Sequence, residues 1–443
     1  MLRKAISSCV AGSSAPARRA LLRRGLAASA SPSDSPAEGH YPGEQTVPFV
    51  ETPTVQIQHP HPIPAYRIMD NDGSIRAGAQ PAADGIDKLR DEEAAVSMYA
   101  TMVRLQAMDQ VFYDAQRQGR ISFYMTSGGE EAVHIGSAAA LNPADMIFAQ
   151  YREPGVLMWR GFSLQQFADQ CFGNCDASEK GRQMPVHYGS AELNFQTISS
   201  PLATQIPQAS GAAYAYKLAA QQAGKAEVDR IAVCYFGDGA ASEGDFHPAL
   251  NMAATLEAPV LFFCRNNGFA ISTPIADQFR GDGIASRASG YGMASIRVDG
   301  NDLFAVYDAT RRAREYIVRE GKPCLVESMA YRQGHHSTSD DSTRYREIDE
   351  IKHWKENDDP LLRTRAYLEA QGWWSQAKEE KLREVERANV LVALEKAEHK
   401  DKPALDTMFE DVYKVMPTHL ARQQAEMLAH VAKYPDQYPV GGH

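Results

Sequence analysis

Residues Tyr235 to Pro274 read "YFGDGAASEGDFHPALNMAATLEAPVLFFCRNNGFAISTP". An apolar strand ends at Phe236, a turn follows around Asp238, and a helix-length segment separates this turn from a second apolar strand, which runs into the turn around Asn267. This is the order of one β-α-β unit, and its right-handed crossover places both turns at the same carboxyl edge of a parallel sheet. Asp238 and Asn267 are therefore expected to lie close together.

Short apolar runs continue on both sides of this unit and predict an α/β fold with an open, mostly parallel sheet. Helix-length segments separate the runs, which is typical of a sheet covered by helices. The expected strands are "RIAVCYF" (Arg230 to Phe236), "PVLFFC" (Pro259 to Cys264), "SIRVDG" (Ser295 to Gly300) and "PCLVES" (Pro323 to Ser328). A long helix is expected to begin at Asp91 and to end at Gly119, because apolar residues recur every three or four positions between them.

Composition divides the chain into four parts. Residues 1–33 contain five arginines, one lysine, many Ala and Ser, and no acid, which is the composition of an organelle transit peptide; a basic tail kept in the mature chain is the alternative. Residues 34–90 are rich in Pro, Gly and polar residues and are expected to form an extended arm that wraps a surface. Residues 91–346 would form the α/β domain, and residues 347–443, which turn helical and charged, a C-terminal helical region.

Bulk properties exclude several classes of protein. The chain has 443 residues, of which 44% are hydrophobic and 23% charged, and these values are ordinary for a globular protein. No stretch reaches the roughly 18 unbroken apolar residues of a membrane-spanning helix. The formal net charge of −10 at pH 7 argues against nucleic acid as the main partner. A dinucleotide-binding enzyme is disfavoured because no G-x-G-x-x-G opens a helix after a first strand.

The turns around Asp238 and Asn267 offer ligands for a hard divalent cation. A carboxylate, an amide oxygen and a backbone carbonyl near Phe269 supply part of an octahedron, which phosphate oxygens and water can complete, so magnesium is the natural ion. The glycines beside Asp238 let the backbone approach phosphates closely, and the following helix N-terminus favours their charge. Taken alone, "GDG" is usually a turn and "NNG" a tight hairpin or loop.

Together, the two turns resemble the motif of the thiamine-diphosphate enzymes, which begins with G-D-G and ends with N-N. Five longer stretches are similar to the branched-chain family of 2-oxoacid dehydrogenase E1 α subunits: "AQYREPGVLMWRG", "GRQMPVHYGS", "ISSPLATQIPQA", "CRNNGFAISTP" and "YRQGHHSTSDD". The likeness covers residues 40–443. It implies the thiamine-diphosphate-binding fold and a place in the mitochondrial matrix, in agreement with the basic segment 1–33.

The resemblance also implies a reaction. It is the oxidative decarboxylation of branched 2-oxo acids derived from Val, Leu and Ile, followed by reductive acylation of the lipoyl group of an E2 partner. The pyruvate dehydrogenase α subunit is an alternative, since it shares the cofactor motif, but it is less similar in "GHHSTSDD" and "SSPLATQ". A non-catalytic regulatory paralogue is a second alternative. The chain-length preference of the substrate and the cleavage site of the transit peptide stay open.

Position by position, the resemblance implies ligands for two metal ions and the cofactor. Magnesium would be bound by Asp238, Asn267 and the carbonyl of Phe269. Thiamine diphosphate would contact Tyr151, Arg152, Ser200, Leu202, Asp238, Gly239, Ala240, Arg265, Asn267 and His336. Potassium would be bound by Ser199, Pro201, Thr204 and Gln205. For Arg152, an ion pair with a nearby glutamate is the alternative role.

The stretch "YRQGHHSTSDDSTRYR", Tyr331 to Arg346, leaves the same edge of the predicted sheet. His336 matches the family histidine that contacts the diphosphate and assists acyl transfer, and an imidazole pKa near 6.5 would let it exchange protons at matrix pH. Ser337 matches a regulatory phosphorylation site, which implies a kinase and a phosphatase; His335 has no assigned role. The unmodified loop is expected to be ordered by ion pairs and hydrogen bonds of Arg332, Asp340, Tyr345 and Arg346.

One part of the expected chemistry is missing from the sequence. The family activates the cofactor with a glutamate from a second domain, and only one α/β domain is evident here. The chain therefore resembles half of an active site, completed by a β subunit in an α2β2 heterotetramer, with the lipoyl domain of E2 as the acyl acceptor.

Overall fold

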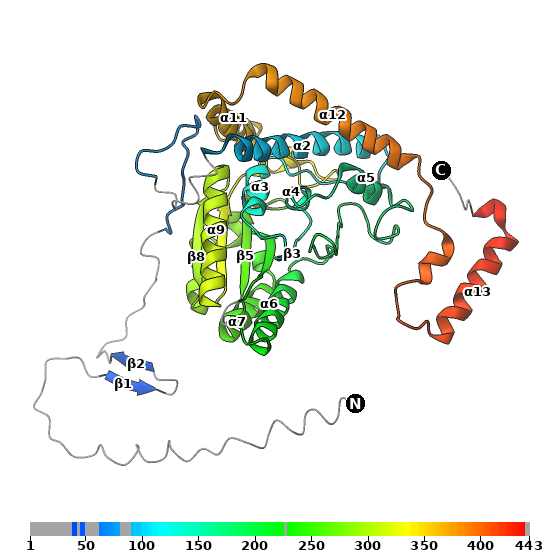
Figure 1. The fold of residues 1–443 in the computed structure, drawn as a ribbon, viewed down its shortest axis with the longest axis horizontal. Helices are drawn as coiled ribbons and strands as arrows, with labels where there is room; N and C mark the ends of the chain where they lie inside the picture. The colour runs from blue at the N-terminus through cyan, green and yellow to red at the C-terminus, as the bar shows by residue number, and fades with distance from the viewer. Residues whose placement is uncertain (1–37, 42–44, 49–61, 80–89, 226–227, 439–443) are drawn as a thin grey trace, which may run out of the picture. The chain divides into compact units, whose positions relative to one another are not determined.

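The computed structural model describes residues 38–41, 45–48, 62–79, 90–225 and 228–438 (Figure 1). The predicted transit segment, residues 1–33, lies outside these residues. Residues 1–58 form one unit, in which β1 (Glu38–Tyr41) and β2 (Gln45–Pro48) pair antiparallel. Residues 59–443 form the other. The four-part division of the chain stays a prediction.

The larger unit is built on a five-stranded parallel sheet in the order β3-β4-β5-β9-β8. Its strands are β3 (Met146–Phe148), β4 (Ala232–Gly237), β5 (Val260–Asn266), β8 (Ala294–Asp299) and β9 (Cys324–Met329). The predicted parallel sheet is thus confirmed, with β3 as a strand that the sequence patterns did not indicate. Gly237 lies opposite Arg265 in the β4–β5 register, so the two turns of the opening motif leave the sheet side by side.

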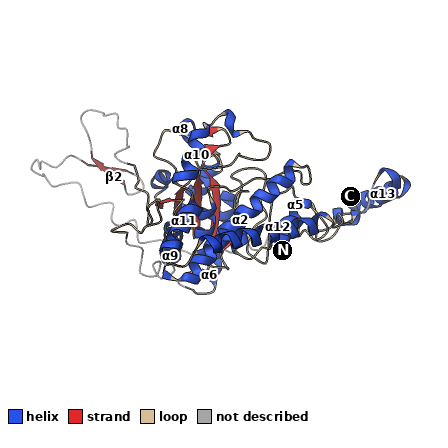
Figure 2. Ribbon diagram, turned by 90° about the horizontal axis from the view of Figure 1, so that it is seen from above, coloured by secondary structure: helices blue, strands red, loops and turns tan. Residues whose placement is uncertain are grey.

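Helices pack on both faces of this sheet, as the α/β prediction requires (Figure 2). Val233 and Tyr235 of β4 belong to one buried cluster, which includes α2, α3 and α9 residues, whereas Cys234 and Phe236 belong to a second cluster with α6 and α7. This alternation along one strand is the period of two expected for a sheet buried on both faces. The helices of the domain are α2 (Glu92–Arg117), α3 (Glu131–Ala139), α4 (Pro154–Trp159), α5 (Leu164–Phe172), α6 (Gln205–Gln222), α7 (Phe246–Leu256), α8 (Ile275–Gln278) and α9 (Leu303–Glu320).

The first long helix begins where its sequence predicts. Asp91 is the N-cap of α2, and its carboxylate accepts hydrogen bonds from the amides of Glu93 and Ala94. The helix ends at Arg117, and Gly119 follows with a φ of +78°, a left-handed conformation that glycine adopts without strain.

The chain after Arg346 is helical, as predicted. Its helices are α10 (Ile348–Asn357), α11 (Pro360–Ala370), α12 (Gln376–Glu398) and α13 (Thr418–Lys433). α12 packs on α2, where Arg104 donates two hydrogen bonds of 2.9 Å to the buried carboxylate of Glu386. By contrast, α13 has no buried residue. Among the described residues, no helix combines the length and apolar character that crossing a bilayer requires.

Residues 62–79 cover the edge strand β8. The amide of Tyr66 donates to the carbonyl of Arg297 at 2.9 Å, and the amide of Asp299 donates to the carbonyl of Tyr66 at 3.0 Å, which makes one parallel bridge beside β8. Pairing of this kind occupies backbone groups that an open sheet edge would otherwise offer to another chain.

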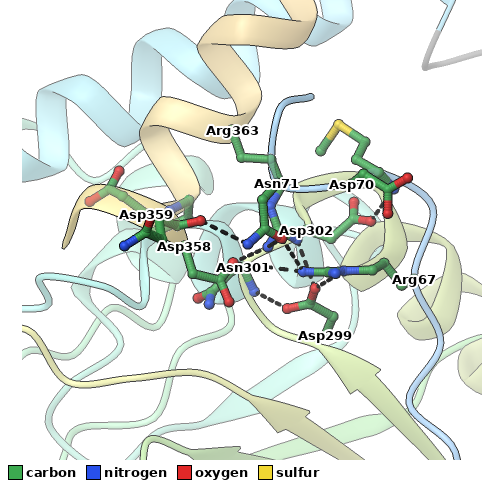
Figure 3. Close-up of polar contacts among 12 residues, drawn as sticks. Arg67, Asp70, Asn71, Asp299, Asn301, Asp302, Asp358, Asp359 and Arg363 are labelled. Carbon is green, nitrogen blue, oxygen red and sulfur yellow. Dashed lines mark hydrogen bonds and ion pairs between the residues drawn. The ribbon is translucent and has the colours of Figure 1, made fainter. Parts of the chain in front are cut away.

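A cluster of ion pairs and hydrogen bonds fastens this segment to the end of β8 and to α11 (Figure 3). The fully buried guanidinium of Arg363 pairs with Asp358 and donates to Asp299 Oδ2 at 2.7 Å and to Asn71 Oδ1 at 3.0 Å. Arg67 donates to the same two acceptors, each at 2.6 Å. Ion pairs and hydrogen bonds within this cluster therefore join three segments that are far apart in the sequence.

Asp302 joins the segment to the sheet through backbone amides. Its buried carboxylate accepts hydrogen bonds from the amides of Ile68 at 2.7 Å and Met69 at 2.6 Å. As the N-cap of α9, it also accepts from the amides of Phe304 and Ala305. One side chain thus satisfies four buried donors in two segments.

Replacing Asp302 with alanine is expected to lower the free energy of unfolding by roughly 3 kcal/mol or more, because each buried donor left without a partner costs about 1–3 kcal/mol. Asp91→Ala is the matched control: it removes an exposed N-cap that holds no second segment, and should cost about 1 kcal/mol. Urea unfolding of both variants checks this difference. Equal losses would contradict the role given to the contacts with Ile68 and Met69.

Candidate functional site

The carboxyl ends of β4, β5 and β9 border a cavity of about 170 Å³. The predicted site residues that line it are Tyr151, Arg152, Leu202, Asp238, Gly239, Ala240, Arg265, Asn267, Phe269 and His336. Its remaining lining comes from Gln150, Gly237, Glu243, Ala270, Ile271 and Arg332. The expected convergence of the turns around Asp238 and Asn267 is therefore observed, together with the Tyr151-Arg152 pair and the loop that carries His336.

Asp238 has a buried carboxylate. Among the described residues, no cationic side chain forms an ion pair with it. It is 1% exposed, and Oδ2 accepts a hydrogen bond of 2.7 Å from the side-chain amide of Gln278. Burial raises the pKa of Asp238 above its ordinary value, although the hydrogen bond from Gln278 acts in the opposite direction. A buried carboxylate held by neutral amides is a position where a bound cation would relieve the cost of desolvation.

Arg265 is buried at the end of β5 and lies between two glutamates. Its Nη1 donates to Glu130 Oε2 at 2.5 Å, and its Nε donates to Glu153 Oε1. Burial lowers the pKa of this guanidinium, but the Glu153 and Glu130 carboxylates outweigh that effect, so the group stays charged. Glu130 and Glu153 are both fully buried, which is tolerated because each is paired.

Asn267 is held by the same carboxylate. Its side-chain Nδ2 donates to Glu130 Oε1 at 2.8 Å, while its Oδ1 accepts from the amide of Phe269 at 3.2 Å. Glu130 thus contacts a predicted diphosphate ligand, Arg265, and a predicted metal ligand, Asn267, at once.

Arg152 connects this cluster to the loop after β9. Its Nη2 lies 3.2 Å from His336 Nδ1 and donates to the carbonyl of His336 at 2.8 Å, and its Nη1 donates to the carbonyl of Thr126 at 2.5 Å. It also forms an ion pair of 3.8 Å with Glu130, the alternative partner expected from the sequence. The ion pair and a place on the cavity wall are therefore compatible.

The expectation that His336 titrates near neutral pH is wrong for this structure. Burial, together with the neighbouring guanidiniums of Arg152 and Arg332, lowers the pKa of His336 to about 3. The imidazole is therefore neutral at physiological pH, with Nδ1 facing Arg152.

Hydrogen bonds order the loop through the residues predicted for that role. Arg332 Nη2 donates to the hydroxyl of Tyr345 at 2.8 Å, which donates to Asp340 Oδ2 at 2.6 Å. The same Asp340 oxygen accepts from the amide of His336 at 2.7 Å, and Arg346 donates to the carbonyl of Gly334 at 2.7 Å. Hydrogen bonds rather than ion pairs join these side chains.

Ser337 lies inside this ordered loop. It is 8% exposed, and its hydroxyl accepts a hydrogen bond of 3.3 Å from the amide of Ser339. The neighbouring Thr338 is bound to Tyr124 through its amide at 3.1 Å. His335, which the sequence left without a role, accepts from the amide of Ser342 at Nδ1 and so closes the loop.

The segment predicted to bind potassium borders the cavity only through Leu202. Thr204 Oγ1 donates to the carbonyl of Pro201 at 3.2 Å, and Gln205 Nε2 donates to the carbonyl of Tyr235 at 3.0 Å. No contact joins Ser199 to these groups within the described residues. Ser200 does not line the cavity; its hydroxyl lies 2.7 Å from His187 Nε2.

Three residues of the site had no role in the sequence patterns: Glu130, Glu153 and His187. Glu153 and His187 lie inside quoted motifs, "AQYREPGVLMWRG" and "GRQMPVHYGS", which could have pointed to them. Glu130 lies in "SGGEEAVH", where two adjacent glycines before an acid are the only signal. The described residues contain no group of three or more His, Cys, Asp or Glu able to hold a metal, so a cation here would need amide, carbonyl or phosphate ligands as well.

Comparison with known proteins identifies one family. The family model of the dehydrogenase E1 component matches residues 99–406. The chain is 53% identical over 378 residues to the human mitochondrial 2-oxoisovalerate dehydrogenase subunit alpha, covering 85% of this chain and 82% of that protein. It is 54% identical over 381 residues to the Arabidopsis thaliana mitochondrial subunit alpha 1, covering 86% and 78%, and 52% identical over 378 residues to the Caenorhabditis elegans protein, covering 85% of each.

Replacing Tyr345 with phenylalanine is expected to loosen residues 332–346. The change removes the hydroxyl between Arg332 and Asp340, and hydrogen bonds to charged groups contribute about 1.5–3 kcal/mol, so amide exchange in the loop should be about tenfold faster or more. Hydrogen-exchange mass spectrometry measures this. Tyr413→Phe, at a side chain that is 59% exposed, is the control and should change nothing. Unchanged exchange in the Tyr345 variant would show that other contacts order the loop.

Proposed function

This chain belongs to the dehydrogenase E1 component family, and on that premise we propose that it is the α subunit of a branched-chain 2-oxoacid dehydrogenase. The family depends on thiamine diphosphate. The proposed reaction is the oxidative decarboxylation of branched 2-oxo acids from Val, Leu and Ile, with transfer of the acyl group to the lipoyl group of E2. The observation that carries the proposal is the cavity that joins both turns of the opening motif to Arg152 and His336.

The cavity suits a magnesium ion beside a diphosphate. Asp238 supplies a buried carboxylate without a cationic partner, and Asn267 and the carbonyl of Phe269 supply neutral oxygens from the adjacent turn. Hard oxygen ligands of this kind are those that Mg²⁺ takes when phosphate oxygens and water complete its shell.

Two guanidiniums and a turn would bind the diphosphate itself. Arg152 and Arg265 both border the cavity, and a guanidinium binds phosphate oxygens bidentately. Gly239 and Ala240 also line the cavity and present backbone groups to it, and Tyr151 lines it beside Arg152. When bound, thiamine diphosphate supplies a carbanion that attacks the 2-oxo carbon and a cationic ring that accepts the electrons released with CO2.

His336 is proposed to assist acyl transfer. Arg152, one of the two arginines that lower its pKa, is also a proposed diphosphate ligand, so a diphosphate in the cavity would offset part of that charge and favour a protonated imidazole. Arg152 contacts the imidazole ring at Nδ1, and Asp340 accepts a hydrogen bond from the backbone amide of His336.

Potassium is proposed at the segment Ser199 to Gln205. The hydroxyl of Thr204 donates to the carbonyl of Pro201 at 3.2 Å, so two of the proposed oxygen ligands lie close together. Ala203 between them has a φ of +66°, a left-handed conformation. Hydroxyl, amide and carbonyl oxygens without a carboxylate suit a monovalent cation. The same segment would meet the cofactor through Leu202, which lines the cavity.

The assembly is proposed to be an α2β2 heterotetramer that binds the lipoyl domain of E2. The relatives are named as alpha subunits and as mitochondrial proteins. A β subunit would supply the glutamate that activates the cofactor, and α13, which has no buried residue, is a surface that a partner could cover. The basic segment 1–33 would direct the chain to the mitochondrial matrix.

The assembly of this chain with a β subunit is expected to turn over 3-methyl-2-oxobutanoate at least about tenfold faster than pyruvate at equal concentrations, because specificity differences of a few methyl groups are worth about 1–3 kcal/mol. Steady-state kinetics with a lipoyl acceptor measure both substrates. A preference for pyruvate would favour the pyruvate dehydrogenase α subunit, and no turnover of either would favour a regulatory paralogue.

Phosphorylation of Ser337 is proposed to switch the enzyme off. Phosphate adds nearly two negative charges, and at a buried hydroxyl beside His336 it must displace the contacts that order the loop. A kinase and a phosphatase would then be further partners.

The substitution Ser337→Glu is expected to reduce acylation of a lipoyl domain by at least about tenfold, since it places charge and bulk where the loop is closed. Ser339→Glu adds the same charge to the same loop at an exposed position and is the matched control, with acylation close to wild type. A radiolabel or mass assay of the lipoyl domain gives the readout. Intact acylation in the Ser337 variant would remove the electrostatic account of this switch.

A further inference from the structure

Glu130 contacts three proposed cofactor or metal ligands without facing the cavity itself. Its Oε2 accepts from Arg265 at 2.5 Å, and its Oε1 accepts from Asn267 Nδ2 at 2.8 Å and lies 3.8 Å from Arg152 Nε. The side chain is fully buried and is absent from the cavity lining. Its position behind the ligands suits a role that acts through them.

The local backbone explains how an acid reaches this position. Glu130 is the N-cap residue of α3, yet its side chain makes no hydrogen bond to the amides of that helix, which is the usual role of an acid there. Gly129 precedes it with a φ of +91°, and a Cβ at Gly129 would lie 2.1 Å from the carbonyl of Tyr331. Only glycine permits this close approach to the start of the loop after β9, and the approach turns Glu130 inward.

The contact with Asn267 has a chemical consequence. A carboxamide presents an oxygen on one side and a donor nitrogen on the other, and a metal ion can use only the oxygen. An ionised carboxylate accepts hydrogen bonds and donates none, so Glu130 selects the nitrogen of Asn267 and leaves Oδ1 on the side of Phe269.

We propose that Glu130 is a positioning residue that fixes the Asn267 amide with its oxygen toward the metal while holding Arg265 in place. This inference rests on the proposed function, because it concerns the metal and diphosphate site of that reaction. Arg265 and Asn267 donate to different oxygens of Glu130, and glutamine at position 130 keeps an oxygen at only one of these two places, so one of the donors would lose its acceptor.

A reciprocal swap tests the proposal. The double variant combines Glu130→Gln with Asn267→Asp. The amide at position 130 can accept from Arg265 and donate to the carboxylate at position 267, whose second oxygen remains available to the metal. The total charge is unchanged. Glu153 gives the matched control: it is equally buried and also binds Arg265, but it does not contact Asn267.

The experiment measures Mn²⁺ binding with thiamine diphosphate by electron paramagnetic resonance, using the assembly of this chain with its β subunit. Glu130→Gln is expected to weaken Mn²⁺ binding about tenfold, and the double variant with Asn267→Asp to return to within about threefold of wild type. Glu153→Gln combined with Asn267→Asp should bind no better than either of its single variants. If Glu130→Gln does not assemble, Mn²⁺ binding by the double variant is compared with binding by Asn267→Asp alone. Tighter binding by the double variant is then the expected result.

Two failures can be told apart. If the wild-type assembly binds Mn²⁺ with the cofactor but the swap gains nothing over the single variants, Glu130 has only a general structural role and the inference is wrong. If the wild-type assembly binds neither Mn²⁺ nor thiamine diphosphate, the proposed function fails, and the positioning role fails with it.

Discussion

The burial of one guanidinium organises the functional edge of this protein. Arg265 ends the central strand β5 at 1% exposure, and an unpaired charge there would cost several kcal/mol. Glu130 at the start of α3 and Glu153 at the start of α4 supply the compensating charges. Two segments that lie more than a hundred residues before Arg265 in the sequence are thereby held against it, and the proposed ligands Asn267 and Arg152 are positioned from the same cluster.

The charged groups around Arg265 also link the proposed metal ligands to the loop of residues 332–346, which carries Ser337. Arg152 contacts Glu130 on one side and His336 on the other, and Asp340 and Tyr345 carry the connection into the residues around Ser337. A change in the loop therefore bears directly on a residue proposed to bind the diphosphate. The proposed regulatory and catalytic roles of this loop have a shared physical basis in one hydrogen-bond network.

The sequence predicts the frame of the site well and its supporting residues poorly. Crossover handedness and strand order bring Asp238 and Asn267 together, so a β-α-β pattern was sufficient to place them. Glu130 and Glu153 were not predicted because their partner Arg265 is distant in sequence and single acids carry no periodic signal. β3 has only three residues, too few for a strand pattern. The lowered pKa of His336 depends on burial and on the proximity of Arg152 and Arg332, which only the tertiary structure provides.

The central claim is that the turn around Asp238 binds a metal and diphosphate. The most direct test is calorimetric titration of thiamine diphosphate with Mg²⁺ into the assembly of this chain with its β subunit, comparing wild type with Asp238→Ala. The account predicts tight binding by wild type and binding weaker by about a hundredfold in the variant, since it loses the only carboxylate among the proposed metal ligands. Equal affinity in the two proteins would contradict it.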